Sequence, residues 1–208
     1  DKISLWFKLN KLSLNVKKTN FILFRSHNSP HHLNIDIKID NKKIEQVHST
    51  KFLGVVINQT LSWKEHIYLI KQKIKKNVGI IRKISKSVPQ SVLLSLYHTL
   101  IHPYLAYCNI VWAIDKTTFL DKLFVSQKKA IRLIANSKFN SHTAPFFLKL
   151  SILTIYQLND LQVGCFVYRC TRNTLHNKFC SMFNTNSSIH SHQTRQCTKL
   201  HHEHCILH

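Results

Sequence analysis

The chain has 208 residues, 44% of them hydrophobic, which is ample for a packed core in one domain or two small ones. Thirty lysines and arginines stand against nine aspartates and glutamates, giving a formal net charge of +21. The composition excludes a disordered polypeptide, and the charge indicates a polyanionic or acidic partner. Nucleic acid is the default partner, but charge alone leaves a membrane surface or an acidic protein open.

The first sixty residues have the pattern of a helix followed by strands. Apolar residues recur with a helical period from residue 2 to residue 12 and predict a stripe packed against a core. The stripe is Ile3, Trp6, Leu9 and Leu12. This helix begins abruptly, so we expect the chain to start inside a larger domain. Residues 12–16 alternate in polarity and residues 21–24 are β-rich, which predicts two strands around the basic connection 17–20.

A hairpin and a further strand are predicted between residues 35 and 57. Alternating isoleucines over residues 35–39, the polar turn 40–43 and the apolar Ile44 and Val47 form a hairpin signature, with residues 52–57 as the next strand and partner. The β-branched residues 55–57 follow Gly54 and lead into the turn-forming residues 58–60. This pattern predicts a short buried strand that ends in a turn.

Beyond residue 63 the periodicity becomes helical. Helices are predicted over about 64–86, 92–105, 117–136 and 155–168, with Ser62 as the N-cap of the first. Glu65 is the only acid in the first helix, whereas a helix charged for solubility mixes signs to form i, i+4 pairs. Its one-signed surface therefore predicts contact with phosphates rather than a merely solvated face.

The run from Val92 to Ile114 contains no Lys, Arg, Asp or Glu, and its length is comparable with the roughly 20 residues that cross a bilayer. Pro103, with two nearby histidines, favours a buried helix, a break and a second apolar segment over a membrane span.

The six cysteines are scattered, and no signal peptide opens the given sequence. We expect free thiols in an intracellular compartment, nucleus or cytoplasm, with Cys108, Cys165 and Cys170 in the core. The tail from residue 174 to residue 208 is rich in His, Ser, Thr and Cys and is expected to be weakly ordered or truncated. The spacing of Cys197, His201 and Cys205 raises a zinc hypothesis, although it matches no standard ligand spacing.

Four blocks carry a resemblance to a known family. They are NKLSLNVKKTNFILF (10–24), KFLGVVINQTLSWKEHI (51–67), LYHTLIHPYLAYCNIVW (96–112) and QKKAIRLI (127–134). In this order they resemble the distal part of the reverse transcriptase of non-LTR (LINE-type) retrotransposons. The resemblance covers about residues 1–173, and residues 190–195 look like the family's His-x-x-x-Thr-Arg segment.

The resemblance implies an α+β fold, in which a small antiparallel β-hairpin palm remnant is followed by a helical thumb bundle. Residues 1–60 would be the distal palm, 61–173 the thumb and post-thumb, and 174–208 a basic tail. Lys18 matches the lysine of motif D, whose ammonium is thought to assist the leaving pyrophosphate; the bland alternative is a solvated turn lysine. Phe52, Leu53 and Gly54 match the primer grip; the alternative is an ordinary core strand.

The sequence departs from the family in its acidic residues. Nucleotidyl transfer in the family uses divalent metal, typically Mg²⁺, held by paired aspartates, and no two acidic residues are adjacent in this chain. We therefore expect a fragment that begins after the catalytic aspartates, with no metal site or cofactor of its own. The remainder of the parent polyprotein, its fingers and upstream palm, would be a partner.

We therefore predict a fragment of an RNA-directed DNA polymerase that binds an RNA template and DNA primer, does not polymerise alone and contacts no membrane. A domesticated, non-catalytic basic nucleic-acid-binding protein and a zinc-dependent module centred on the tail stay open as alternatives. Beside the primer grip, we expect nucleic-acid contacts from basic residues of two helices. These are Lys71, Lys75, Lys76, Arg82, Lys83, Lys128, Lys129 and Arg132.

Overall fold

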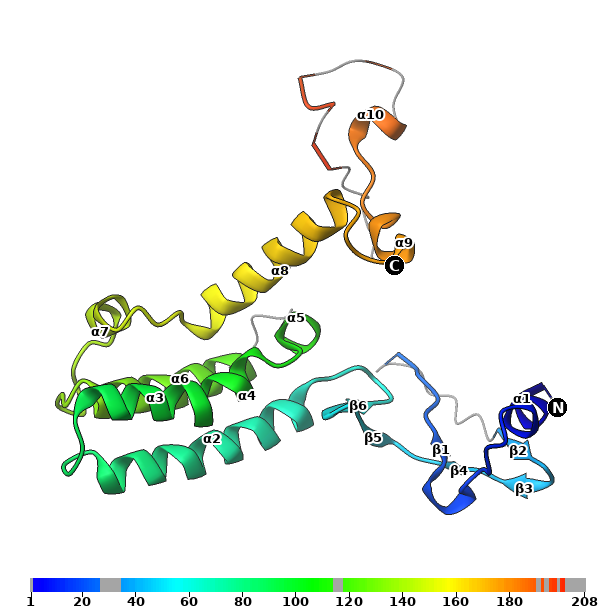
Figure 1. Ribbon diagram of the computed structural model, residues 1–208, viewed down its shortest axis with the longest axis horizontal. Coiled ribbons are helices and arrows are strands. Elements are labelled where there is room, and N and C mark those ends of the chain that lie inside the picture. The colour runs from blue at the N-terminus through cyan, green and yellow to red at the C-terminus, as the bar shows by residue number, and fades with distance from the viewer. Residues whose placement is uncertain are drawn as a thin grey trace.

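The computed structural model describes residues 2–26, 35–113, 118–189, 192, 195–197 and 199–200, and these form an α+β structure. Short strands and one helix lie at one end of the molecule, and a helical bundle forms the other (Figure 1). The first part contains α1 (Lys2–Leu9), a 3-10 helix (Val16–Lys18), β1 (Asn20–Phe21), β2 (Lys38–Ile39), β3 (Lys42–Lys43), β4 (Glu45–Gln46), β5 (Ser49–Phe52) and β6 (Val55–Asn58).

The rest of the described chain is helical. Its elements are α2 (Lys64–Ile84), α3 (Gln90–Leu100), α4 (His102–Ala106), α5 (Asn109–Trp112), α6 (Thr118–Ile134), α7 (Ala144–Lys149), α8 (Ile155–Thr171), α9 (Asn177–Cys180) and α10 (Asn186–Ile189). Helix α8 leads from the bundle to the two short helices of the tail (Figure 1).

The strands form three separate pairs rather than one sheet. β2 and β3 make the expected hairpin, but its turn is only Asp40 and Asn41. β4 pairs in parallel with β1 instead of extending that hairpin, and β5 pairs with β6. The strand expected over residues 52–57 is therefore divided by a turn at Leu53 and Gly54, and residues 12–15 form no strand.

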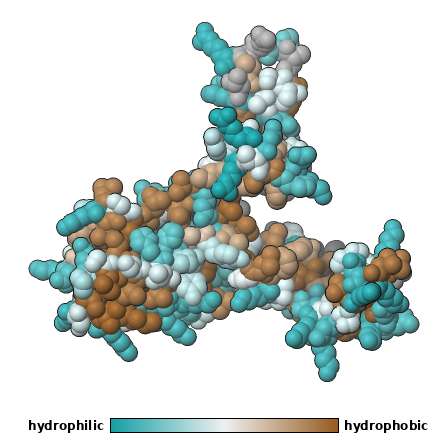
Figure 2. Space-filling model, viewed as in Figure 1, coloured by the Kyte–Doolittle hydropathy of each residue, from teal (hydrophilic) through white to brown (hydrophobic). Residues whose placement is uncertain are grey.

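The apolar stripe of α1 is exposed, contrary to the sequence prediction. Ile3, Trp6 and Leu9 keep 54%, 56% and 74% of their surface accessible, and Ser4 is the buried residue of this helix. Hydrophobic surface is visible at this end of the molecule (Figure 2). The short strand pairs present no broad apolar face against which the stripe could pack.

Helix α2 forms because its apolar residues follow the helical period. Ile70, Ile74 and Ile81 are at most 6% exposed and pack into the bundle core. Ser62 is not the N-cap: Trp63 occupies that position without a capping side chain. The side chain of Asn58 instead accepts a hydrogen bond from the Ser62 amide at 2.8 Å, which fixes the turn between β6 and α2.

The uncharged run from Val92 is interrupted, as its proline predicts. Helix α3 ends at Leu100, and α4 begins at His102 with Pro103 in its first turn, where the missing amide proton costs nothing. Residue 114 lies outside the described residues. Over the part of the chain that the structure describes, every helix is too short or too polar to cross a bilayer.

A buried polar side chain joins several helices of the bundle. Gln127 of α6 is fully buried, and its amide nitrogen donates to the Tyr97 hydroxyl of α3 and to the Leu153 carbonyl, both at 2.9 Å. Its side-chain oxygen accepts from the Ile155 amide at 3.0 Å, at the start of α8. Burial raises the pKa of Tyr97 to about 12, so its hydroxyl stays protonated.

The described cysteines are free thiols, as expected. Cys170 is buried and Cys108 is half-buried, but Cys165 is exposed on α8 rather than part of the core. In the tail, α9 and α10 are single turns, and one isolated bridge joins Thr185 to Leu200.

Candidate nucleic-acid interface

The predicted primer-grip residues form the exposed tip of the β5–β6 hairpin. Phe52 pairs with Val55, which leaves Leu53 and Gly54 as a two-residue turn with φ values of 45° and 87°. Positive φ at both positions matches the twist of the flanking strands. Phe52 and Leu53 are 61% and 73% exposed, so they are not core residues. The hairpin tip therefore exposes two apolar side chains at the surface of the molecule.

The tip is fastened to the helical bundle at its turn. The hydroxyl of Tyr107, in the segment between α4 and α5, donates to the Leu53 carbonyl at 2.6 Å. A Cβ added to Gly54 would lie 3.3 Å from the Tyr107 ring, so the glycine also allows this close approach. The position of the tip is therefore fixed by a residue more than fifty positions later in the chain.

A second contact holds strand β6 against α2. The Val56 amide donates to Nδ1 of His66 at 3.2 Å, which requires that nitrogen to be unprotonated. His66 is 5% exposed, and its Nε2 has no hydrogen-bond partner among the described residues. Burial, helped by the charge of Lys73, lowers the pKa of His66 and keeps the ring neutral.

The basic residues of α2 divide between two faces. With 3.6 residues per turn, Lys71, Lys75 and Arg82 lie along one flank of the helix, beside the buried stripe. Lys76 and Lys83 project from the face opposite the core. Four of these five side chains are exposed and Lys71 is half-buried. The predicted cations thus surround the outer half of α2 rather than forming one row.

Helix α6 separates its predicted cations as well. Lys129 is exposed on its outer face. Lys128 lies on the flank toward α7, with Nζ 4.1 Å from the centre of the Phe124 ring, and Arg132 donates from Nε to the Ser141 carbonyl at 3.0 Å. Arg132 is therefore partly used to fix the loop after α6. Lys128 and Arg132 face a different side of the molecule from Lys71.

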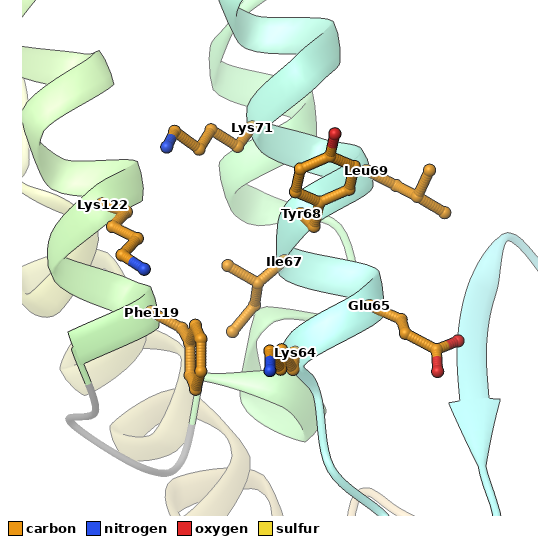
Figure 3. A pocket seen from close by; sticks show the side chains of 8 residues that line it. All are labelled: Lys64, Glu65, Ile67, Tyr68, Leu69, Lys71, Phe119 and Lys122. Atoms are coloured by element: carbon orange, nitrogen blue, oxygen red, sulfur yellow. The ribbon is translucent and has the colours of Figure 1, made fainter.

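A groove opens between the N-terminal halves of α2 and α6. Its volume is about 640 Å³, and Figure 3 shows the Lys71 side chain extending from α2 toward α6 and the Lys122 side chain extending from α6 toward Phe119. At its lower end, Nζ of Lys64 is 5.6 Å and Nζ of Lys122 is 5.1 Å from the centre of the Phe119 ring. Both contacts are of cation–π type. Three ammonium groups therefore converge on one groove.

The carboxylates that form ion pairs lie away from the basic residues of α2 and α6. The ion pairs among the described residues all involve Asp36 or Asp40, at the strand end of the molecule. Lys43 and Lys38 hold the pKa of the Asp36 carboxyl below its ordinary value. The cations of α2 and α6 form none of these pairs, so this surface carries uncompensated positive charge and attracts polyanions.

Lys18, the predicted catalytic residue, ends the 3-10 helix that precedes β1 and is exposed. The carboxylates of Asp36 and Asp40 face lysines, and that of Asp121 accepts a hydrogen bond from Tyr156, so these three are not arranged as a two-metal site. Groups of three potential metal ligands are absent from the described residues.

Of the three residues in the zinc hypothesis, the structure describes Cys197. His201 and Cys205 lie outside the described residues, as do most of residues 190–195.

The groove itself was not predicted from the sequence. Lys64 and Lys122 are missing from the predicted contacts, as are the aromatic residues Tyr68 and Phe119. The place of Lys64 could have been predicted from the sequence. Lys64, Lys71, Lys75 and Arg82 follow the spacing i, i+7, i+11 and i+18, which puts them on one helix flank. The contribution of α6 could not be predicted, because it depends on which helix packs beside α2.

Comparisons with protein-family models, with curated proteins and with solved structures find no match to this chain. The fold and the surface described above are therefore the basis for assigning a function.

Proposed function

We propose that the chain is the distal palm and thumb portion of an RNA-directed DNA polymerase of the non-LTR retrotransposon type, and that it holds the template–primer duplex. In this proposal the β5–β6 tip is the primer grip and α2 to α8 are the thumb and post-thumb. The exposed stripe of α1 contacts the fingers and upstream palm of the parent. Mg²⁺ belongs to that missing part, and the protein acts in the nucleus or cytoplasm.

One observation carries the proposal. An exposed apolar tip ends a hairpin whose strand β6 is held against α2, a helix whose lysines and arginine have no ion-pair partner among the described residues. A duplex offers phosphates at regular spacing to such cations, and contacts of this kind depend on charge and shape rather than base sequence. In this proposal the predicted cations of α2 provide the phosphate contacts beside the hairpin, whereas Lys128 and Arg132 of α6 face another side of the molecule.

Lys18 has its proposed role only in the complete enzyme, where its ammonium would face the leaving pyrophosphate. Replacing Lys18 by alanine in a reconstructed full-length enzyme should lower the single-turnover rate of nucleotide addition. An unchanged rate would remove this role and leave the duplex-binding proposal intact.

The isolation of the described carboxylates favours a second candidate, a non-catalytic basic nucleic-acid-binding protein derived from such an element. Both candidates use the same surface. The genomic reading frame separates them: an upstream frame encoding a paired-aspartate hairpin supports the polymerase fragment. A start codon directly before this chain, with a regulated transcript, supports the second candidate.

The binding proposal is tested with a fluorescent RNA–DNA hybrid and anisotropy measurements from low to physiological salt. We expect affinity to fall steeply with salt, and replacing Lys71 and Lys75 by glutamine to reduce the slope by about 0.9 for each lost phosphate contact. The matched control replaces Lys38 and Lys43, which are already paired with Asp36, and should change the slope little. An affinity that is independent of salt would contradict the proposal.

A further inference from the structure

The groove between α2 and α6 has the dimensions and walls of a ligand site. Its volume of about 640 Å³ lies within the range of small-molecule pockets, roughly 300–1,000 Å³. The floor is Ile67, and the walls are Tyr68, Leu69 and Phe119 with the aliphatic stems of three lysines. A flat phosphate-binding surface would not need this enclosure or these aromatic rings.

The charges at the groove favour an anion. Nζ atoms of Lys64 and Lys122 both lie within 6 Å of the Phe119 ring centre, and Lys71 extends toward α6 farther along the groove (Figure 3). Glu65 is the acid that lines the groove, and its carboxylate points away from the lysines, toward the strand side (Figure 3). Two like charges that share one ring repel each other, and a phosphate between them would turn this repulsion into attraction.

The aromatic residues indicate what accompanies the phosphate. The Phe119 ring is already in contact with two ammonium groups, whereas Tyr68 is 59% exposed at the mouth of the groove. An aromatic ring beside a phosphate site is the arrangement that binds a nucleobase by stacking. A base inside a duplex has both faces covered by its neighbours, so only an unpaired base can lie on Tyr68.

We infer that this groove binds one unpaired nucleotide of a nucleic-acid strand. Its phosphate lies between Lys64 and Lys122, with Lys71 farther along the groove, and its base stacks on Tyr68. The inference rests on the proposed function, because it gives the duplex-holding surface a second element that recognises the single strand leaving the duplex. It depends on a groove and an aromatic ring, however, which duplex binding alone does not require.

The test leaves charge unchanged and removes only the ring. Tyr68→Leu in the full chain is compared with Tyr168→Leu, an equally exposed tyrosine on α8 outside the groove. Affinities for oligouridine and for an RNA–DNA hybrid are measured by fluorescence anisotropy. Tyr68→Leu should weaken oligouridine binding by about tenfold, the usual size of a base–aromatic stack, and leave hybrid binding unchanged. The control variant should bind both as the wild type does.

A second measurement uses the wild type, so that it does not depend on a variant. Oligouridine containing 5-iodouridine is irradiated in the complex, and the crosslinked peptide is identified by mass spectrometry. A crosslink at Tyr68 or Phe119 supports the inference. The inference is overturned if Tyr68→Leu leaves the oligouridine affinity unchanged, or if the crosslink forms only elsewhere. If hybrid binding persists in either case, the proposed function still stands. A wild type that binds neither ligand overturns both.

Discussion

At the scale of single residues, Gly54 determines how the hairpin tip meets the bundle. Alanine at this position would have to adopt φ near 87° and place its Cβ 3.3 Å from the Tyr107 ring. Left-handed backbone costs an L-residue about 1–2 kcal/mol, so Gly54→Ala should lower the free energy of unfolding by that amount. Urea unfolding followed by circular dichroism measures the change.

Gly79 provides the matched control for this prediction. It lies inside α2, and nothing is within 4 Å of the Cβ that an alanine would add. Glycine in a helix interior is less stable than alanine by about 0.5–1 kcal/mol, so Gly79→Ala should raise the free energy of unfolding by that amount. Equal effects of the two substitutions would contradict the role assigned to the turn.

His66 gives the hairpin a dependence on pH. Protonation would take Nδ1 away from the Val56 amide, and burial followed by the charge of Lys73 lowers the pKa of His66 below its ordinary 6.5. The stability that the neutral ring contributes is therefore complete above about pH 6.5 and is lost as pH falls through the lower folded-state pKa. NMR titration of the ring proton should give a pKa below 6.5, with His66→Gln identifying the signal. A pKa at or above 6.5 would refute this account.

At the scale of elements, the buried side chain of Gln127 joins α6 to α3 and to the start of α8. Gln127→Leu leaves the Ile155 amide, the Leu153 carbonyl and the Tyr97 hydroxyl without a partner. Unpaired buried groups cost about 1–3 kcal/mol each, so we expect a loss of about 3 kcal/mol in unfolding free energy. Gln162→Leu removes a single bond, to the Ala106 carbonyl, and should cost about 1 kcal/mol. The prediction fails if denaturant titration gives the two variants equal stability.

The elements also differ in how well the sequence predicts them. The inward stripes of α2 and α6 are periodic over many residues, so their existence and buried faces follow from local pattern alone. The strands have two to four residues, and β4 pairs with a strand 25 positions earlier. Contacts between residues far apart in the sequence determine this pairing, so local pattern does not predict it. For the candidate site, the excess of lysines in α2 was predictable, but their meeting with Lys122 and Phe119 depends on helix packing.

At the scale of the whole molecule, the ion pairs of the described residues are gathered at one end. Uncompensated cations cover the helical bundle, whereas the described ion pairs lie at the end that carries α1 and the first strands. A duplex that contacts the hairpin tip can therefore reach the outer half of α2 without meeting a cluster of acids. Under the proposed function, this arrangement leaves the cations of the bundle available to phosphates.

Nucleotide addition by the isolated chain tests the expectation that it does not polymerise alone. Joining a nucleotide to a primer by two-metal chemistry requires carboxylates a few ångströms apart, and no two acidic residues are adjacent in the sequence. Among the described residues, Asp36 is held by two lysines and Asp121 by Tyr156, so neither can join a second acid around a cation pair. With an RNA template, a DNA primer, Mg²⁺ and nucleotides, we expect hybrid binding without primer extension on a sequencing gel. Template-directed extension by the purified chain would contradict the proposal, because it would require a catalytic centre that these side chains do not form.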